Sequence, residues 1–140
     1  MKGDKIPDQD HVARYCSPIH APEGEIQATA FMLRAVDKSL SINWLEYFRC
    51  LNREDEIAEL RKAYSAKKLI IKAKGKIAVL NVGEVCEKVL TESPNNRKLE
   101  ILHDPSENDP SHSGIYNIRS DDELIAELIL ETVSETYPAR

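Results

Sequence analysis

The sequence has little glycine and none of the glycine-rich loops that hold phosphate groups. Its five glycines form neither G-x-x-x-x-G-K-[S/T] nor G-x-G-x-x-G. This excludes the two common nucleotide-binding loops and predicts no cofactor. The three cysteines, Cys16, Cys50 and Cys86, are odd in number and widely spaced, with no C-x-x-C pair. Such usage excludes a disulfide framework and a cysteine zinc motif, and it predicts three reduced thiols.

Long apolar runs are also missing. No apolar stretch approaches the roughly 18 residues of a membrane-spanning helix. The longest apolar region, residues 69–82, is interrupted by three lysines and by Gly75. Residues 1–10 contain no apolar core of a secretory signal. We therefore expect a cytoplasmic protein without membrane association.

The charged residues are unevenly distributed along the chain. The net charge is −5, which disfavours a general affinity for nucleic acid. Residues 67–98 carry eight Lys and Arg against three Glu, whereas residues 100–135 carry ten Asp and Glu against one Arg. The two segments could attract each other within the fold, or the basic segment could face an acidic partner.

The length of 140 residues favours a single domain, with residues 1–10 as a mobile or lead-in N-terminal arm. Runs rich in β-branched residues predict strands at residues 26–34, 40–42, 69–73, 77–82, 98–103 and 115–118. The first two runs and the next two are spaced as hairpins. Val12 and Tyr15 allow a further strand near the N-terminus. The fold class predicted is α+β, a mostly antiparallel sheet built from hairpins with about three helices on one face.

Three stretches have the apolar spacing of helices that bury one face. Asn43 can cap a helix and Asn52 can cap a second, so residues 44–65 form either one bent helix or two. Residues 84–92 predict a short helix. Ser120 begins a capping box, with Glu three positions later, ahead of the apolar C-terminal helix.

The polar loop between the last two predicted strands holds the foremost candidates for chemistry. His103, Asp109 and His112 are residue types that ligate metals or transfer protons, and histidine titrates near neutral pH. If the loop folds them together, they could form a hydrolytic site, with or without a metal. However, the Asp-Pro pairs at 104–105 and 109–110 are also common turn formers. The loop is therefore either a site or a structural junction.

Two further groups of residues could bind ligands. His11, Cys16 and His20 could ligate a metal, although their spacing fits no common zinc pattern. The second group lies at the tip of the predicted hairpin after residue 69 and consists of Lys72, Lys74 and Lys76. These lysines could bind an anion or a partner, or could simply keep a strand edge solvated.

The contrast between the basic and acidic segments favours a non-catalytic interaction or accessory protein. It would bind a protein partner or itself, as part of a larger assembly or homo-oligomer. The alternative is a small hydrolase or transferase that acts on a phosphoester or nucleotide, with His103, Asp109 and His112 as catalytic residues. Nucleic-acid binding through residues 67–76 is the least favoured of the three classes.

Overall fold

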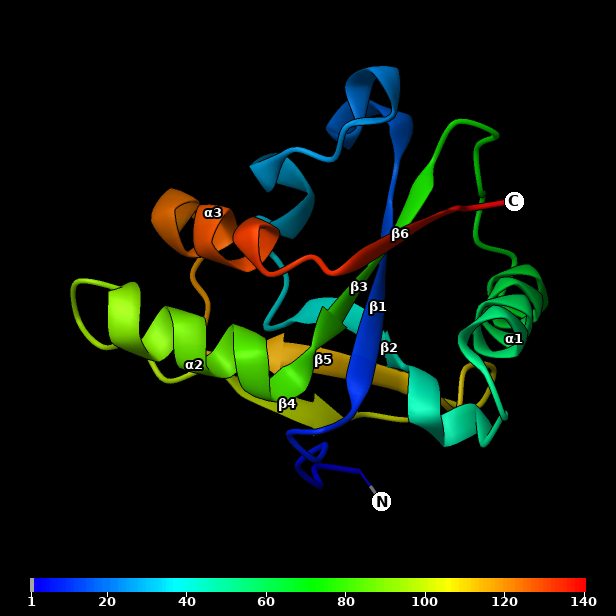
Figure 1. Cartoon of the computed structure of the whole chain (residues 1–140), viewed down its shortest axis with the longest axis horizontal. Helices are drawn as coiled ribbons and strands as arrows, with labels where there is room; N and C mark the ends of the chain where they lie inside the picture. Colours follow the sequence, from blue (N-terminus) through cyan, green and yellow to red (C-terminus); the bar gives the residue numbers. More distant parts are fainter. Residues whose placement is uncertain (1) are drawn as a thin grey trace.

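The computed structural model describes residues 2–140, which form one α+β domain built on a six-stranded antiparallel sheet (Figure 1). The strands lie in the order β4-β5-β2-β1-β3-β6. Their bounds are His11–Cys16 (β1), Leu40–Trp44 (β2), Lys76–Asn81 (β3), Glu100–His103 (β4), His112–Tyr116 (β5) and Glu135–Pro138 (β6). The same residues form three α-helices, Arg53–Ala66 (α1), Val82–Glu92 (α2) and Glu123–Glu131 (α3). The predicted fold class is confirmed. None of these helices is long and apolar enough to cross a membrane.

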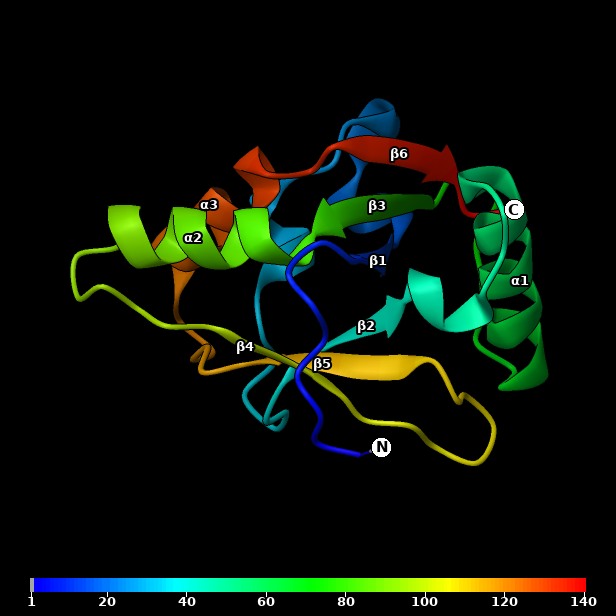
Figure 2. The ribbon, with the colours of Figure 1, turned by 60° about the horizontal axis from the view of Figure 1, so that its bottom comes forward.

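The sheet is covered on both faces, which corrects the prediction of helices on one face only. In β3 the side chains of Ile77, Ala78, Val79 and Leu80 are all fully buried. Successive side chains of a strand point to opposite faces. Accordingly, Ala78 and Leu80 pack in the cluster of α2 and α3, whereas Ile77 and Val79 pack in that of α1. Figure 2 shows α1 on one side of the strands and α2 with α3 on the other.

Two of the predicted strands are wrong, and with them both predicted hairpins. Residues 26–34 contain a 3₁₀ turn, Ala28–Phe31 (η3), whose last two residues are buried. Residues 69–73 form a loop, because α1 ends at Ala66 and Lys68 then takes the left-handed conformation (φ 58°), where the chain turns away. The edge of β3 is instead paired with β6, a largely polar strand that the sequence pattern did not indicate.

Helix α1 begins later than the first predicted cap. Asn43 lies inside β2, whereas Asn52 caps α1 by accepting a hydrogen bond from the amide of Asp55 (2.9 Å). A separate 3₁₀ turn, Leu45–Phe48 (η4), precedes it and ends at Arg49, which is left-handed (φ 54°). This region is therefore a 3₁₀ turn followed by one α-helix. The short helix predicted before the polar loop is confirmed as α2.

Helix α3 forms where predicted, but Ser120 is not its cap. Asp122 takes the N-cap position, and its carboxylate accepts hydrogen bonds from the amide of Arg119 and from Nη1 of Arg97, both at 2.7 Å. Burial acts to raise the pKa of Asp122, but these hydrogen bonds outweigh it and hold the pKa below its ordinary value of 3.8.

Replacing Asp122 by asparagine should lower the free energy of unfolding near neutral pH by about 1–2 kcal/mol, because charge-assisted hydrogen bonds are lost. A carboxyl whose pKa is lowered by folding stabilises the fold above its unfolded pKa, and this contribution disappears as the pH falls through the folded pKa. The difference from the natural chain should therefore shrink below the ordinary pKa of 3.8. Urea denaturation at pH 7 and pH 3 measures it, with Asp121→Asn as the matched control. A difference that does not change with pH would contradict the electrostatic origin.

The N-terminal segment, Gly3–Ile6, runs along the outer edge of β4. The amide of Ile6 donates to the carbonyl of Ile101 (3.0 Å), and the Ile6 side chain is fully buried. Residues 3–6 thus cover part of an edge that would otherwise present unpaired backbone groups. The chain leaves this edge at Pro7, where a turn closes by a hydrogen bond from the amide of Asp10.

The sheet opens between β1 and β2. These strands pair at only two positions, Val12 with Trp44 and Ala13 with Asn43. Beyond them β1 stays paired with β3 as far as Cys16. On its side of the opening, β2 stays paired with β5 back to Leu40. The two halves of the sheet therefore diverge, and side chains rather than backbone hydrogen bonds must fill the space between them.

Candidate anion-binding pocket

The polar loop does not bring its two histidines together. His103 and Ser113 are directly opposite each other in the β4–β5 hairpin. His112 is the neighbour of Ser113, so it points to the other face of the sheet. His103 lies buried between the rings of Trp44 (5.1 Å between centroids) and Tyr47 (5.4 Å), and its Nε2 donates to the carbonyl of Pro110 (2.8 Å).

His112 is held by groups on its own side of the hairpin. Its Nδ1 donates to the carbonyl of Asp104 (2.9 Å), and its Nε2 lies 3.3 Å from the hydroxyl of Ser41. One ring nitrogen of each loop histidine thus donates a hydrogen bond to a backbone carbonyl of the loop. This geometry closes the hairpin loop.

Asp109 is the buried anchor of the same loop. Its carboxylate accepts a hydrogen bond from the side-chain amide of Asn43 (2.8 Å) and forms an ion pair with Lys67 at the end of α1 (2.6 Å). Ser111 also contacts it, at 3.4 Å. Asp109 therefore ties the loop to β2 and α1, and neither loop histidine side chain is bonded to its carboxylate among residues 2–140.

The other predicted ligands are also apart. Cys16 is buried in the larger core cluster, and His20 pairs with the hydroxyl of Thr29 (2.9 Å). His11 pairs with Glu46 instead (2.7 Å). Within residues 2–140 no group of three or more His, Cys, Asp and Glu side chains is placed to hold a metal ion.

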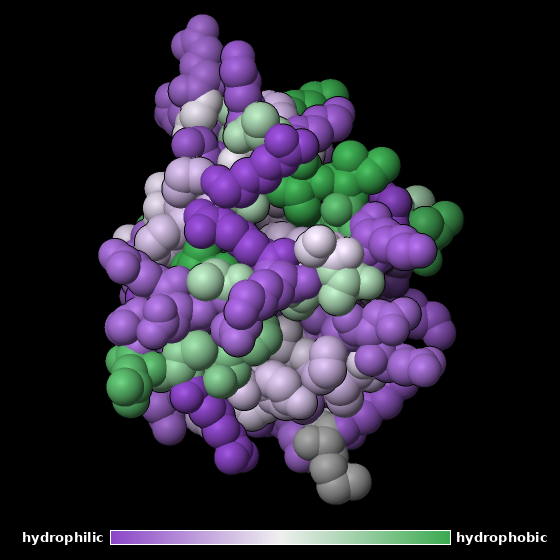
Figure 3. All heavy atoms as spheres, turned by 90° about the vertical axis from the view of Figure 1, so that its right-hand side faces the viewer, coloured by the Kyte–Doolittle hydropathy of each residue, from purple (hydrophilic) through white to green (hydrophobic). Residues whose placement is uncertain are grey.

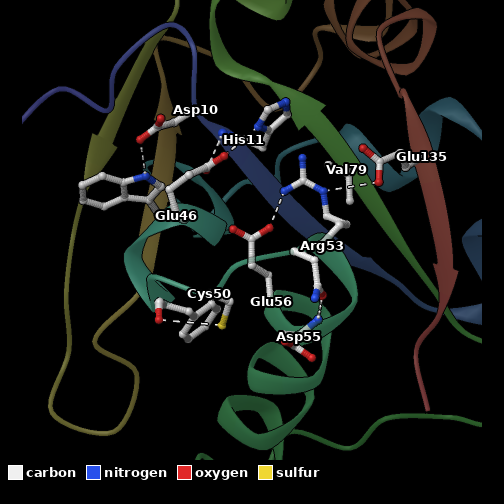
Figure 4. A network of polar contacts seen from close by, with 12 residues as sticks. Asp10, His11, Glu46, Cys50, Arg53, Asp55, Glu56, Val79 and Glu135 are labelled. Carbon is white, nitrogen blue, oxygen red and sulfur yellow. Dashed lines mark hydrogen bonds and ion pairs between the residues drawn. The ribbon is translucent and has the colours of Figure 1, made fainter.

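Sequence reasoning missed the polar network around His11, which Figure 4 shows at close range. Glu46 accepts from both the amide and the Nδ1 of His11, and it thereby attaches η4 to the start of β1. Nearby, Arg53 pairs with Glu56 (2.6 Å) and with Glu135 of β6 (3.3 Å). Burial raises the pKa of Glu56. Three carboxylates, those of Glu46, Glu56 and Glu135, lie here with one arginine, so the network joins elements and offers no unpaired cation to an anionic ligand.

The predicted lysines do not form a hairpin tip. Lys72 and Lys74 are exposed in the loop after α1, whereas Lys76 is half-buried as the first residue of β3. Their side chains have no ion pair among the described residues.

A different group of basic residues surrounds the opening between β1 and β2. The opening holds a cavity of about 400 Å³ that we call the Arg14 pocket. Its polar lining consists of Arg14, Tyr15, Ser17, His20, Arg34, Ser41, Asn43, Tyr64 and Lys67. A neighbouring hollow of about 480 Å³ shares Arg14, His20, Arg34 and Ser41 with it.

Arg14 is the central cation of this pocket. Its Nε donates to the carbonyl of Ala30 in η3 (2.5 Å), and its Nη1 donates to the carbonyl of Ser41 (2.7 Å), which β1 would otherwise have paired. Its Nη2 has no hydrogen bond within residues 2–140, and no carboxylate there forms an ion pair with the guanidinium. Burial lowers the pKa of Arg14, but an arginine remains charged at neutral pH.

The hydroxyl of Tyr64 is the second unsatisfied group in the pocket. The side chain is buried, and its hydroxyl has no hydrogen-bond partner among residues 2–140. Burial raises the pKa of Tyr64, so the group stays protonated and can donate. A buried hydroxyl without a partner costs free energy unless something outside the protein bonds to it.

Other cations around the pocket are already paired. Lys67 pairs with Asp109, and the exposed Arg34 pairs with Asp37 (2.8 Å). Arg14 is therefore the one arginine or lysine of the pocket lining that has no ion pair among residues 2–140. An anion that contacts Arg14 would compensate a half-buried charge, and Tyr64, whose hydroxyl has no partner among residues 2–140, lines the same pocket.

One feature of the sequence could have indicated this site. Val12, Arg14 and Cys16 are every second residue of β1, so their side chains lie on one face of the strand. Val12 and Cys16 are both buried. A cation at a core-facing position requires a partner, so Arg14 marks a place where polar groups converge.

No protein-family model, curated protein or solved structure matches this chain.

Proposed function

We propose that the protein is a non-catalytic binding protein that recognises a phosphate monoester in the Arg14 pocket. The observation that carries this proposal is the Arg14 guanidinium, which is bonded to two backbone carbonyls and has no carboxylate partner among residues 2–140. A charge held in this way is pre-organised, because its side chain loses little further freedom when an anion binds.

The number of donors around the pocket favours a phosphate over a carboxylate. Nη2 of Arg14 and the buried hydroxyl of Tyr64 have no hydrogen-bond partner among residues 2–140, and both residues line the pocket together with Arg34 and His20. A tetrahedral phosphate offers oxygens in several directions, whereas a planar carboxylate is satisfied by one bidentate contact. The neighbouring hollow also includes Met32 and Leu33, which could contact the organic part of the ester.

The non-catalytic part of the proposal rests on the histidines. His103 and His112 are engaged with backbone carbonyls away from the pocket, and His20 lies at its rim with Thr29 as its partner. The pocket thus contains strong donors but no carboxylate free to act as a base beside them.

Isothermal titration calorimetry with glycerol phosphate, inorganic phosphate and glycerol tests the proposal. Both phosphates should bind one to one, the affinity should fall as salt is raised, and glycerol should give no heat. An assay for released phosphate should show no turnover. Absence of binding by both phosphates at low salt would overturn the proposed ligand, and steady release of phosphate would overturn the non-catalytic assignment.

Replacing Tyr64 by phenylalanine should separate binding from stability. A lost hydrogen bond to a charged ligand should weaken phosphate binding by about 10-fold or more. The free energy of unfolding without ligand should stay equal or rise slightly, because the hydroxyl is buried without a partner. Tyr47→Phe is the matched control, since the Tyr47 side chain is exposed and lies outside the pocket. Unchanged binding combined with lower stability would instead mean that the Tyr64 hydroxyl serves the fold.

A further inference from the structure

A second hollow lies between α2 and the edge of β4, on the side of the molecule away from α1. This groove has a volume of about 920 Å³, and we call it the acidic groove. Its apolar floor consists of Cys86, Leu90, Leu99 and Leu102. Leu90 is 41% exposed although it lies on the apolar face of α2. The groove is therefore a hydrophobic surface that the chain itself leaves partly uncovered.

Carboxylates outnumber cations around the groove. Its acidic lining residues are Asp8, Glu84, Glu87 and Glu100, and its basic ones are Lys5 and Lys98. Asp8 is paired with Lys5 (3.2 Å), whereas the other three carboxylates have no ion pair among residues 2–140. A partner that fits this surface must bring apolar side chains together with positive charge.

The chain carries such a segment at its opposite end. The loop at residues 67–74, which we call the basic loop, follows α1 and carries Lys68, Lys72 and Lys74 without ion pairs in the described structure. Leu69 is 40% exposed and Ile70 is 80% exposed at its centre. Figure 3 shows hydrophobic side chains among hydrophilic ones on the face that α1 and this loop occupy.

The two surfaces cannot meet within one chain. Figures 1 and 2 both place α1 and the loop after it at one end of the molecule and α2 at the other, with the sheet between them. Folding pairs the basic and acidic segments of the sequence at Lys67–Asp109, Lys88–Glu131 and Arg97–Asp122. The other lysines of the basic loop and three carboxylates of the acidic groove form no ion pair among residues 2–140. A second copy can supply what each surface lacks.

We propose that the protein associates head to tail, with the basic loop of one copy bound in the acidic groove of the next. Ile70 and Leu69 would cover Leu90 and the groove floor, and the lysines would face Glu84, Glu87 and Glu100. Such a contact joins two different surfaces, so twofold symmetry does not close it, and chains or rings can grow. The basic loop shares two residues, Lys67 and Leu69, with the lining of the Arg14 pocket.

Sedimentation equilibrium from about 10 μM to 1 mM protein, at low and at high salt, tests this association, because small charged interfaces are weak and screened. The average mass should rise above the 15.9 kDa of one chain at low salt and should fall back toward it at high salt. Lys72→Glu with Lys74→Glu should abolish association, as should Glu84→Lys with Glu87→Lys. Lys38→Glu, at an exposed site outside both surfaces, is the control.

Mixing the two double variants distinguishes head-to-tail association from other modes. In the mixture the loop of each variant is complementary in charge to the groove of the other, so the mixture should associate beyond a dimer, and a chain carrying all four changes should associate again. Urea denaturation of every variant shows that it folds. A mass of one chain at all concentrations and salts, or a mixture that remains monomeric, would overturn the proposal. Association that survives both double variants would place the interface elsewhere.

Discussion

Replacing Asp109 by alanine should lower the free energy of unfolding by about 3 kcal/mol. The carboxylate is only 2% exposed and pairs with Lys67, whose side chain is 25% exposed. Removal of one member of such a pair leaves the other charge without a partner, and this lowers the free energy of unfolding by about 3–5 kcal/mol in fully buried pairs. The partial exposure of Lys67 places the expected loss at the lower end. The amide of Asn43 loses an acceptor at the same time.

Urea denaturation of Asp109→Ala, Asp109→Asn and His112→Ala measures this effect. Asp109→Asn keeps an oxygen for the amide of Asn43 but loses the charge, so its loss should be intermediate. His112→Ala should cost about 1 kcal/mol or less, because His112 is half-buried and its partners can bond to water. Asp109 was a candidate catalytic residue. If Asp109→Ala unfolded at the same urea concentration as the natural chain, Asp109 would not be an anchor of the fold, and a chemical role would again account for it.

Replacing Arg14 by methionine should weaken phosphate binding by at least 100-fold. The substitution keeps an apolar stem between the two halves of the sheet but removes the pocket's excess charge and its free Nη2 donor. Arg14→Lys keeps the charge but cannot reach both backbone carbonyls and the ligand at once. It should therefore weaken binding by about 10-fold. Calorimetry at low salt with glycerol phosphate measures both variants.

Arg61→Met is the matched control for the Arg14 variants. Arg61 also donates to a backbone carbonyl, that of Pro138 (2.6 Å), and its loss changes the net charge equally. It lines a different hollow from the Arg14 pocket. Equal weakening by Arg61→Met and Arg14→Met would show that net charge rather than the pocket attracts the phosphate, and this would refute the site.

Elements with a strong local pattern could be predicted from the sequence. The continuous apolar run at residues 77–80 marks an interior strand, and the helical spacing after it marks α2. Strand β6 could not be predicted, because its four residues alternate little and take their strand form from pairing with β3. Asn43 has the local signature of a helix cap, but pairing with Ala13 and His112 placed it in a strand.

The candidate site depends on such long-range pairing even more. The register of β1 with β3 and of β2 with β5 decides where the sheet opens, and no local pattern records it. Arg14 alone was visible as a cation at a core-facing position. The residue types of the loop histidines indicated a site, but the register of the β4–β5 hairpin points His103 and His112 to opposite faces of the sheet.

The strand order has a consequence for the rate of folding. Strand β1 lies between β2 and β3, and residue Ile6 bonds to Ile101 far along the chain. Proteins dominated by contacts between distant residues fold in milliseconds to seconds, because a long loop must close before each contact forms. The β4–β5 hairpin is formed by neighbouring segments and can assemble early. The last strand, β6, completes the sheet only after residues 135–138 have been synthesised, so the nascent protein exposes the edge of β3 until then.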